Sequence, residues 1–200
     1  MFSMDDDLAL LERWRGGDLH AGQDLFARHF GDVFRFFQHK VGNEADELVQ
    51  RTFTACVAAR DAFRGLSSFR TYLFSIARNQ LYTFFRQLPK AEHVDFEVTS
   101  IAELVTSLSS RLGRLQQVEQ LRNALARLPA ELQLLLELHY WHELDAAALA
   151  EVFETTAGNI RVRLLRARKS LRGAMGQIDL EAGNRDGLLA ALSHPESDES

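Results

Sequence analysis

The segment ADELVQRTFTACVAAR, positions 45–60, carries apolar side chains at the spacing of one α-helical face. This face comprises the positions i, i+3, i+4, i+7, i+8, i+11 and i+12, which are Ala45, Leu48, Val49, Thr52, Phe53, Cys56 and Val57, all apolar except Thr52. Polar side chains occupy the opposite face, whereas a half-buried strand would alternate with a period of two. The pattern therefore predicts an amphipathic helix that buries one side against the rest of the chain.

Helical spacing recurs along the chain, and few stretches alternate apolar and polar residues. Only 3 Pro and 12 Gly occur among 200 residues, which favours long regular elements. Further helices are expected over 8–15, 21–39, 69–88, a run opening at the capping box Ser100-x-x-Glu103, a run from Pro129, 146–152 and 157–173. The predicted fold class is all-α.

Residues 89–99 are short, polar and acidic and lack periodicity, which is typical of a linker. We expect two small helical domains, over residues 1–88 and 118–176, joined by a linker over 89–117. The last segment, 177–200, holds six acidic residues and one basic residue. We expect this acidic tail to be partly disordered.

Positive charge is concentrated in two segments of a chain whose net charge is −5. The range 64–90 contains five basic residues and no acidic one, and the range 161–172 contains six and none. Two basic segments on a neutral body predict two contacts with a polyanion. The alternative is that each is simply a solvated helix face.

The second basic segment follows a helix-turn-helix pattern. An apolar-faced helix over 146–152 is followed by the tight connection FETT and by a helix whose stripe is Ile160, Leu164, Ala167 and Leu171. Asp145 is placed to cap the first helix, and Thr155 or Thr156 the second. Such a second helix fits the DNA major groove, with Asn159, Arg161, Val162 and Arg163 towards bases and Arg166, Arg168, Lys169 and Arg172 towards phosphates. An antiparallel helical hairpin with a basic exposed face is the alternative.

The first basic segment interleaves arginines with aromatic residues. Phe74, Tyr82 and Phe85 lie off the stripe of Phe69, Leu73 and Ile76, beside Arg70, Arg78 and Arg86. Aromatic rings next to arginines form a platform on which single-stranded bases stack. The alternative is that a three-helix core encloses these rings.

Two longer stretches resemble a known family. ELVQRTFTACVAARDAFRGLSSFRTYLFSIARNQLYTFFR is similar to domain 2 of bacterial extracytoplasmic-function (ECF) sigma factors, and LPAELQLLLELHYWHELDAAALAEVFETTAGNIRVRLLRARKSLR to their domain 4. The resemblance spans roughly residues 8–175, and its motifs are specific in combination. It implies a sigma factor without catalytic activity, which binds core RNA polymerase and directs promoter recognition, melting and transcription initiation.

The resemblance also implies roles for individual residues. Asp46, Glu47, Gln50 and Arg51 are expected to contact the β′ clamp helices of core polymerase. A contact with the β flap is also implied. The −10 element falls to the base-capturing loop Arg64, Gly65, Leu66, Ser67 and Ser68 and to Arg70, Tyr72, Phe74, Arg78 and Asn79. The −35 element falls to Thr156, Ala157, Asn159, Arg161, Val162, Arg163, Arg166, Arg168 and Lys169. Promoter DNA and an anti-sigma factor are the other implied partners.

The chain departs from the family pattern at three positions. Glu47 stands where Asp is usual, Tyr72 where Trp is common, and Glu154 at a turn position that is often Gly. The change at Glu47 keeps the charge and moves it by one methylene. A residue other than Gly at the turn predicts a strained or differently shaped connection.

Other classes of protein are weaker readings of the same residues. A stand-alone helix-turn-helix regulator with a helical sensor domain would bind a palindrome as a dimer. His139, His142 and Glu143 resemble part of a metal site, but no second cluster supplies more ligands, so neither a metal nor a cofactor is expected. Cys56 belongs to a buried stripe. An acidic N-terminus and the lack of a long apolar run predict a cytoplasmic protein without membrane insertion.

Overall fold

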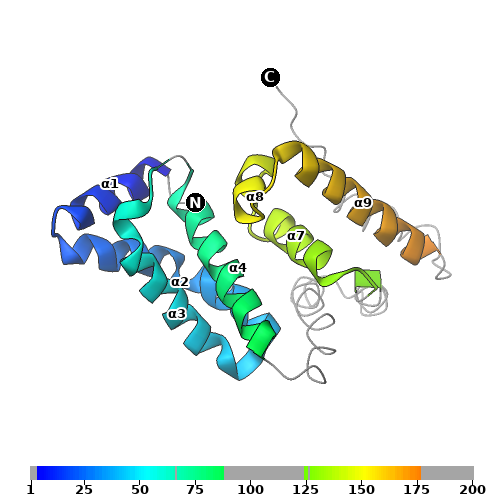
Figure 1. Ribbon diagram of the computed structural model, residues 1–200, viewed down its shortest axis with the longest axis horizontal. Coiled ribbons are helices and arrows are strands. Elements are labelled where there is room, and N and C mark those ends of the chain that lie inside the picture. The colour runs from blue at the N-terminus through cyan, green and yellow to red at the C-terminus, as the bar shows by residue number, and fades with distance from the viewer. Residues whose placement is uncertain (1–3, 66, 88–123, 126, 177–200) are drawn as a thin grey trace, which may run out of the picture. The chain divides into compact units, whose positions relative to one another are not determined.

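A computed structural model describes residues 4–65, 67–87, 124–125 and 127–176 (Figure 1). The regular elements within these ranges are all helical, as predicted. They are α1 (Met4–Arg15), α2 (Leu19–Val41), the short 3₁₀ helix η1 (Gly42–Glu44), α3 (Ala45–Ala58), the 3₁₀ helix η2 (Arg60–Ala62), α4 (Phe69–Gln87), α7 (Ala130–Tyr140), α8 (Ala146–Val152) and α9 (Ala157–Gly176). The predicted all-α class is confirmed.

The contacts within the chain separate it into two compact units. The first comprises residues 1–96 and 144–160 and the second residues 97–143 and 161–200. Helices α1 to α4 and α8 thus belong to the first unit, and α7 with most of α9 to the second. The predicted linker, the capping box at Ser100 and the acidic tail lie outside the described residues, so the predicted domain boundaries stay predictions.

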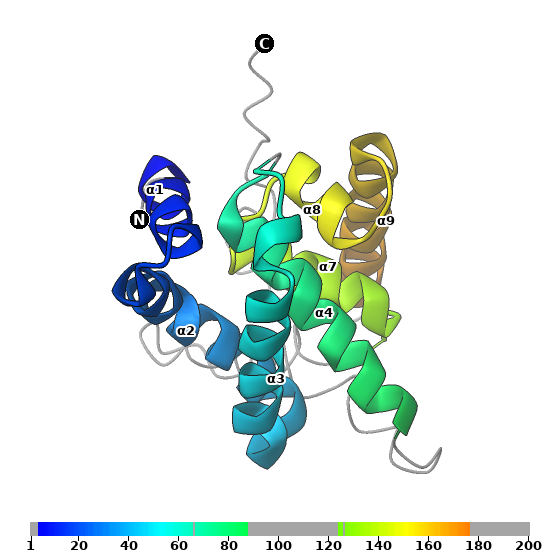
Figure 2. The same cartoon turned by 60° about the vertical axis from the view of Figure 1, so that its left-hand side comes forward.

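Helices α1 to α4 pack in chain order. Helix α1 lies on α2, α2 on α3, and α3 on α4, and the two views agree on the last pair (Figures 1 and 2). Aromatic rings fill the centre, because Phe36 meets Phe37 at 5.1 Å and Phe74 at 5.6 Å, both edge to face. Such pairs add roughly 0.5–1.5 kcal/mol beyond the apolar area that they bury.

The predicted stripe of α3 is largely confirmed. Ala45, Leu48, Val49, Thr52 and Cys56 are buried. The buried hydroxyl of Thr52 donates to the carbonyl of Leu48 at 2.7 Å, which satisfies its polar group. The prediction is wrong for Val57, which is 49% exposed, because it stands one residue before the end of α3.

The apolar surface of α4 is wider than the sequence indicates. Phe74 is 1% exposed and Phe85 is also buried, so the prediction that both lie off the core stripe is wrong. The reason is that α4 contacts α1, α2, α3 and α8, and several neighbours bury a broader arc than one. Only Tyr82 of the three aromatic residues is half-buried, with the Arg78 guanidinium 4.7 Å from its ring centroid.

The helix-turn-helix caps are present as predicted. The Asp145 carboxylate accepts from the Ala148 amide at 2.7 Å, and the Thr156 hydroxyl accepts from the Asn159 amide at 3.2 Å. Each cap satisfies an amide that the first turn of its helix leaves unpaired. The predicted stripe of α9, Ile160, Leu164, Ala167 and Leu171, is buried throughout.

The turn between α8 and α9 holds a left-handed residue. Glu154 has a φ of 52°, so the position that is usually Gly keeps a left-handed backbone despite its side chain. Glu143, just before α8, has a φ of 51°, which the sequence did not indicate. A left-handed residue other than Gly costs roughly 1–2 kcal/mol, and both turns bear that cost.

Candidate functional sites

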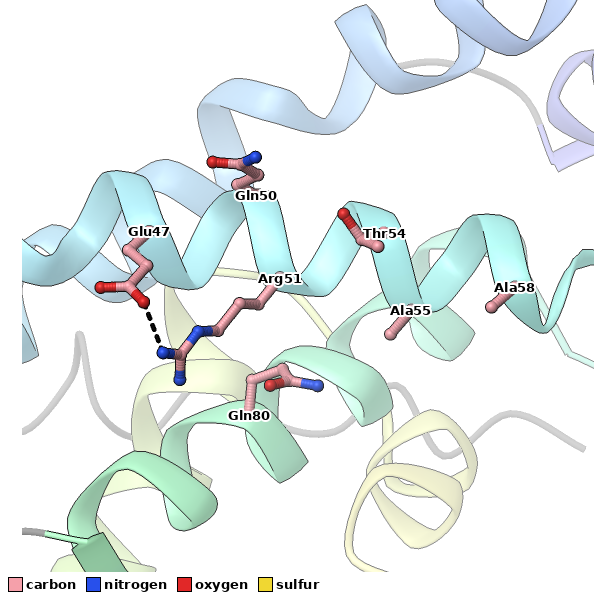
Figure 3. A pocket seen from close by; sticks show the side chains of 7 residues that line it. All are labelled: Glu47, Gln50, Arg51, Thr54, Ala55, Ala58 and Gln80. Carbon is pink, nitrogen blue, oxygen red and sulfur yellow. Dashed lines mark hydrogen bonds and ion pairs between the residues drawn. The ribbon is translucent and has the colours of Figure 1, made fainter.

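A shallow hollow lies on the polar face of α3. Figure 3 shows it lined by Glu47, Gln50, Arg51, Thr54, Ala55, Ala58 and Gln80, the last contributed by α4. Glu47 and Arg51 form an ion pair one helical turn apart, and both side chains are about half exposed. Asp46 is exposed beside them. Between the charged and amide groups the hollow is lined by the small side chains of Ala55 and Ala58.

The connection between α3 and α4 presents an exposed tip. Arg64 and Gly65 are exposed, and Gly65 has a φ of 68°, which favours glycine. Ser68 is engaged as the cap of α4, because its hydroxyl accepts from the Thr71 amide at 3.0 Å. Ser67 is half-buried, and Leu66 lies outside the described residues.

The predicted −10 residues of α4 differ in their access to solvent. Asn79 is exposed, whereas Arg70 and Tyr72 are half-buried. The Arg70 Nε donates to Asp32 at 3.2 Å, and the Tyr72 hydroxyl donates to the Ala59 carbonyl at 3.3 Å. Burial raises the pKa of Tyr72 above its ordinary value. Phe74, buried against Phe36, offers no surface for stacking in this conformation, and its predicted place in the strand-binding platform is therefore corrected.

Helix α9 displays most of the predicted −35 residues. The exposed ones are Thr156, Asn159, Arg161, Val162, Arg166 and Lys169, while Ala157, Arg163 and Arg168 are half-buried. Arg168 is engaged with α7, since its Nε donates to the Tyr140 hydroxyl at 2.8 Å. Its guanidinium also lies 3.3 Å from the His139 Nε2. Arg168 thus links α9 to α7, whereas Arg161, Arg166 and Lys169 are exposed.

The sequence reasoning missed one surface residue of α9. Leu165 is 62% exposed, and Val162, one turn earlier, is exposed as well. Apolar side chains on a helix in the major groove can contact thymine methyl groups. The signal was available, because Leu165 falls outside the stripe of Ile160, Leu164 and Leu171.

The histidines considered as metal ligands have protein partners. The Nε2 of His142 lies 3.9 Å from the carboxylate of Glu137, and both side chains are buried. His139 lies against Arg168. In the part of the chain that the structure describes, no group of three or more His, Cys, Asp or Glu side chains is arranged to hold a metal ion.

Two family models match the chain, in the predicted order. Sigma-70 region 2 matches residues 25–90, and Sigma-70, region 4 matches residues 118–171. Together they cover more than half of the sequence and include α3, α4, α8 and most of α9. A region 2 beside a helix-turn-helix does not favour the stand-alone regulator.

Two known relatives align with this chain over nearly their full length. The RNA polymerase sigma-H factor of Pseudomonas aeruginosa is 27% identical over 195 residues, covering 91% of this chain and 100% of that protein. The ECF RNA polymerase sigma-E factor of Haemophilus influenzae is 29% identical over 181 residues, covering 82% and 93%. This chain therefore belongs to the ECF family of RNA polymerase sigma factors. It directs transcription initiation.

The fold is also found in a solved structure. That of CnrH in complex with the cytosolic domain of CnrY matches with a TM-score of 0.60 at 21% identity, over 87% of this chain and 99% of that one. Such a match supports the two-region helical architecture. None of the helices in the described ranges is both long and apolar enough to span a membrane.

Proposed function

We propose that this sigma factor uses three separate surfaces to start transcription. The polar face of α3 docks on the β′ clamp helices of core RNA polymerase, and a second contact falls on the β flap. The tip between α3 and α4, with the exposed side of α4, takes the melted −10 element. The first turns of α9 read the −35 duplex.

The observation that carries the proposal is the hollow beside Glu47, Gln50 and Arg51. The hollow combines the Glu47–Arg51 ion pair, the exposed amide of Gln50 and two alanine side chains, all on α3. A partner helix that approaches closely can exchange the exposed Glu47–Arg51 pair for pairs of its own. Exposed pairs of this kind contribute only about 0–1 kcal/mol, so the exchange costs little.

Opening the promoter requires that a base leave the stack, which costs a few kcal/mol. Exposed Arg64 and Asn79 and the half-buried Tyr72 are the groups available to offset that cost. The exposed arginines of α9 add phosphate neutralisation at a distance. Because polymerase holds both regions at a fixed separation, each contact raises the effective concentration of the other. The free protein is accordingly expected to bind DNA weakly.

A protein partner that blocks these surfaces is part of the proposal. In the solved structure of CnrH, that protein is in complex with the cytosolic domain of CnrY. By this likeness, we propose that an anti-sigma factor binds the present chain and covers one or both of its DNA-facing surfaces. Co-purification of a tagged full-length chain from its native host, followed by competition between the captured protein and core polymerase, tests this partner.

The function is tested by sequencing the 5′ ends of transcripts made by core polymerase with and without the protein on genomic DNA. The expected result is a set of start sites that appear only with the protein and share −35 and −10 sequences. A protein that adds no start sites to core polymerase and instead forms a tight dimer on a palindrome would contradict the proposal. The shared sequences also supply the promoter for the experiments below.

A further inference from the structure

Helix α1 lies outside the segment that region 2 matches, yet it is firmly attached to that segment. Leu11 and Trp14 are buried, and the Trp14 indole meets the Phe26 ring edge to face at 5.1 Å. Gly22 of α2 allows this approach, because a Cβ there would stand 2.7 Å from the Trp14 Nε1. The contact leaves no room for a larger residue at position 22, so α1 packs on α2 in one position.

A buried polar link fixes α1 at its other end. The carboxylate of Asp7 lies 2.7 Å from the His29 Nε2, and both side chains are buried. Arg28 donates to the second oxygen of the same carboxylate at 3.3 Å. A buried carboxylate with two such partners tolerates little displacement, since a shift would leave it unpaired. Asp7 and Trp14 therefore hold both ends of α1.

Arg15, the last residue of α1, reaches the connection between α3 and α4. Its Nη2 donates to the carbonyl of Arg60 at 2.8 Å and to the carbonyl of Phe63. Its Nη1 donates to Glu12 at 2.7 Å, which orients the guanidinium. The connection also contacts α1 in return, because the Arg60 guanidinium lies over the Trp14 ring, 5.2 Å from its centroid. A single nitrogen, the Arg15 Nη2, thus joins two carbonyls three residues apart.

The same connection is held from the side of α4. The Tyr72 hydroxyl donates to the Ala59 carbonyl, and the buried ring of Phe63 packs on the Tyr72 ring at 4.7 Å. Arg64 and Gly65, which follow Phe63 directly, project from this anchored base and are exposed. The position of the exposed tip therefore depends on where the carbonyls of residues 60 and 63 are held.

We propose that α1 is a clamp that fixes the base of the base-capturing loop, residues 60–65, before DNA arrives, and that Arg15 is its positioning residue. This inference rests on the proposed function of residues 64–68. A loop that is ordered in advance avoids the entropy cost of ordering upon binding, and it discriminates better between a correct and an incorrect base. Arg15 touches no DNA in this scheme and acts only through the two carbonyls.

The first test is hydrogen exchange of the full-length free protein. In Arg15→Ala, the amides of residues 59–65 should exchange about tenfold faster, which corresponds to the loss of one charge-assisted hydrogen bond. Arg15→Lys should give an intermediate rate, because its ammonium keeps a charged donor but sits on a shorter side chain and lacks the second nitrogen that Glu12 orients. The matched control is Arg13→Ala, which removes an exposed arginine of the same helix and should leave these amides unchanged.

Global unfolding is distinguished within the same experiment. The amides of residues 73–81 lie in the interior of α4 and should keep their wild-type rates in Arg15→Ala. Acceleration of these amides equal to that of residues 59–65 would overturn the clamp, since it would show a loss of overall stability. Unchanged exchange of residues 59–65 would overturn it as well.

The second test measures promoter choice with core polymerase at saturating protein. The ratio of initiation on the matched promoter to initiation on promoters with single changes in the −10 element should fall about tenfold in Arg15→Ala and partly recover in Arg15→Lys. A purely structural role would lower both rates together and leave the ratio unchanged, which would overturn the inference. If the wild-type protein starts no promoter-specific transcription, the proposed function fails, and hydrogen exchange still decides whether Arg15 holds the connection.

Discussion

The Arg163 guanidinium on α9 donates from Nη1 to the Glu131 carboxylate on α7 at 2.7 Å. Arg163 is one of the residues expected to reach base edges, yet its positive charge is already partnered within the protein. DNA must therefore compete with Glu131 for this side chain. Binding through Arg163 therefore includes the free-energy cost of breaking this ion pair, and the sequence of α9 alone does not reveal that cost.

Glu131→Gln should strengthen binding to a −35 duplex about two- to threefold at low salt, because an exposed pair is worth at most ~1 kcal/mol. The freed Arg163 should also make the plot of log affinity against log salt steeper by up to about one unit. Fluorescence anisotropy across a salt series measures both effects. Asp24→Asn, an equal change of net charge at an exposed position of α2, should alter neither.

Replacing Arg163 and Arg166 together by Ala should reduce initiation from −35-dependent promoters about tenfold or more, since a good base contact by Arg163 is worth about 1–3 kcal/mol and Arg166 adds phosphate neutralisation. Affinity for core polymerase should stay at the wild-type value. Run-off transcription and a polymerase binding titration measure the two quantities. A parallel loss of polymerase binding would count against the assignment of α9 to DNA.

Replacing Glu47 and Gln50 by Ala should have the opposite effect. Affinity for core polymerase should fall about fivefold or more, as expected for interface residues worth about 1 kcal/mol or more in total, while binding of α9 to a −35 duplex is retained. Gln23→Ala with Asp24→Ala removes the same two functional groups from the exposed side of α2 and serves as the control. Equal loss in both double variants would refute a specific role for the hollow on α3.

Gly22→Ala should destabilise the protein, and Gly31→Ala should not. A Cβ at Gly22 collides with the rigid Trp14 indole at 2.7 Å, whereas one at Gly31 meets only the end of the flexible Arg35 side chain at 3.6 Å. Overpacking costs typically 1–3 kcal/mol, while Gly to Ala within a helix gains up to about 1 kcal/mol. Urea unfolding of the two variants should therefore shift in opposite directions.

Cys56 makes stability depend on alkaline pH. Burial raises the pKa of its thiol from 9.0 to about 12. The unfolded thiol therefore ionises between pH 9 and 12 while the folded one does not, and the stability present below pH 9 is lost as the pH rises. The free energy of unfolding should fall by about 1.4 kcal/mol from pH 8 to pH 10 on this account. Cys56→Ala should lack this component when both proteins are unfolded in urea at the two pH values.

The elements of the fold were largely predictable, because they depend on short-range chemistry. The caps at Asp145 and Thr156 and the stripe of α9 follow from the residues themselves, and each occurs as predicted. The sequence did not predict how wide the buried face of each helix is. Phe74 is buried because α4 packs against several helices, and the sequence of one helix does not give the number of its neighbours.

The sequence predicted which residues belong to the candidate sites, but not which of their side chains are bonded to other residues of the protein. The sequence identifies Arg163 and Arg168 as basic residues of a DNA-facing helix, but not that Glu131 and Tyr140 engage them. Nor does it indicate that Arg15 lies against the carbonyls of Arg60 and Phe63. These contacts join residues 28 to 48 positions apart, and no local pattern records them. They decide which charges are available to a ligand.

The aromatic packing around Phe63 has a consequence for the history of such proteins. Phe63 meets Tyr72 and Phe69, and Phe69 meets the buried His29, so the base of the loop is part of the hydrophobic core. A substitution at the base of this loop therefore also changes the packing of the core and the stability of the protein. New promoter preferences are therefore expected to arise first at the exposed tip, at Arg64 and its neighbours, where substitutions carry little penalty.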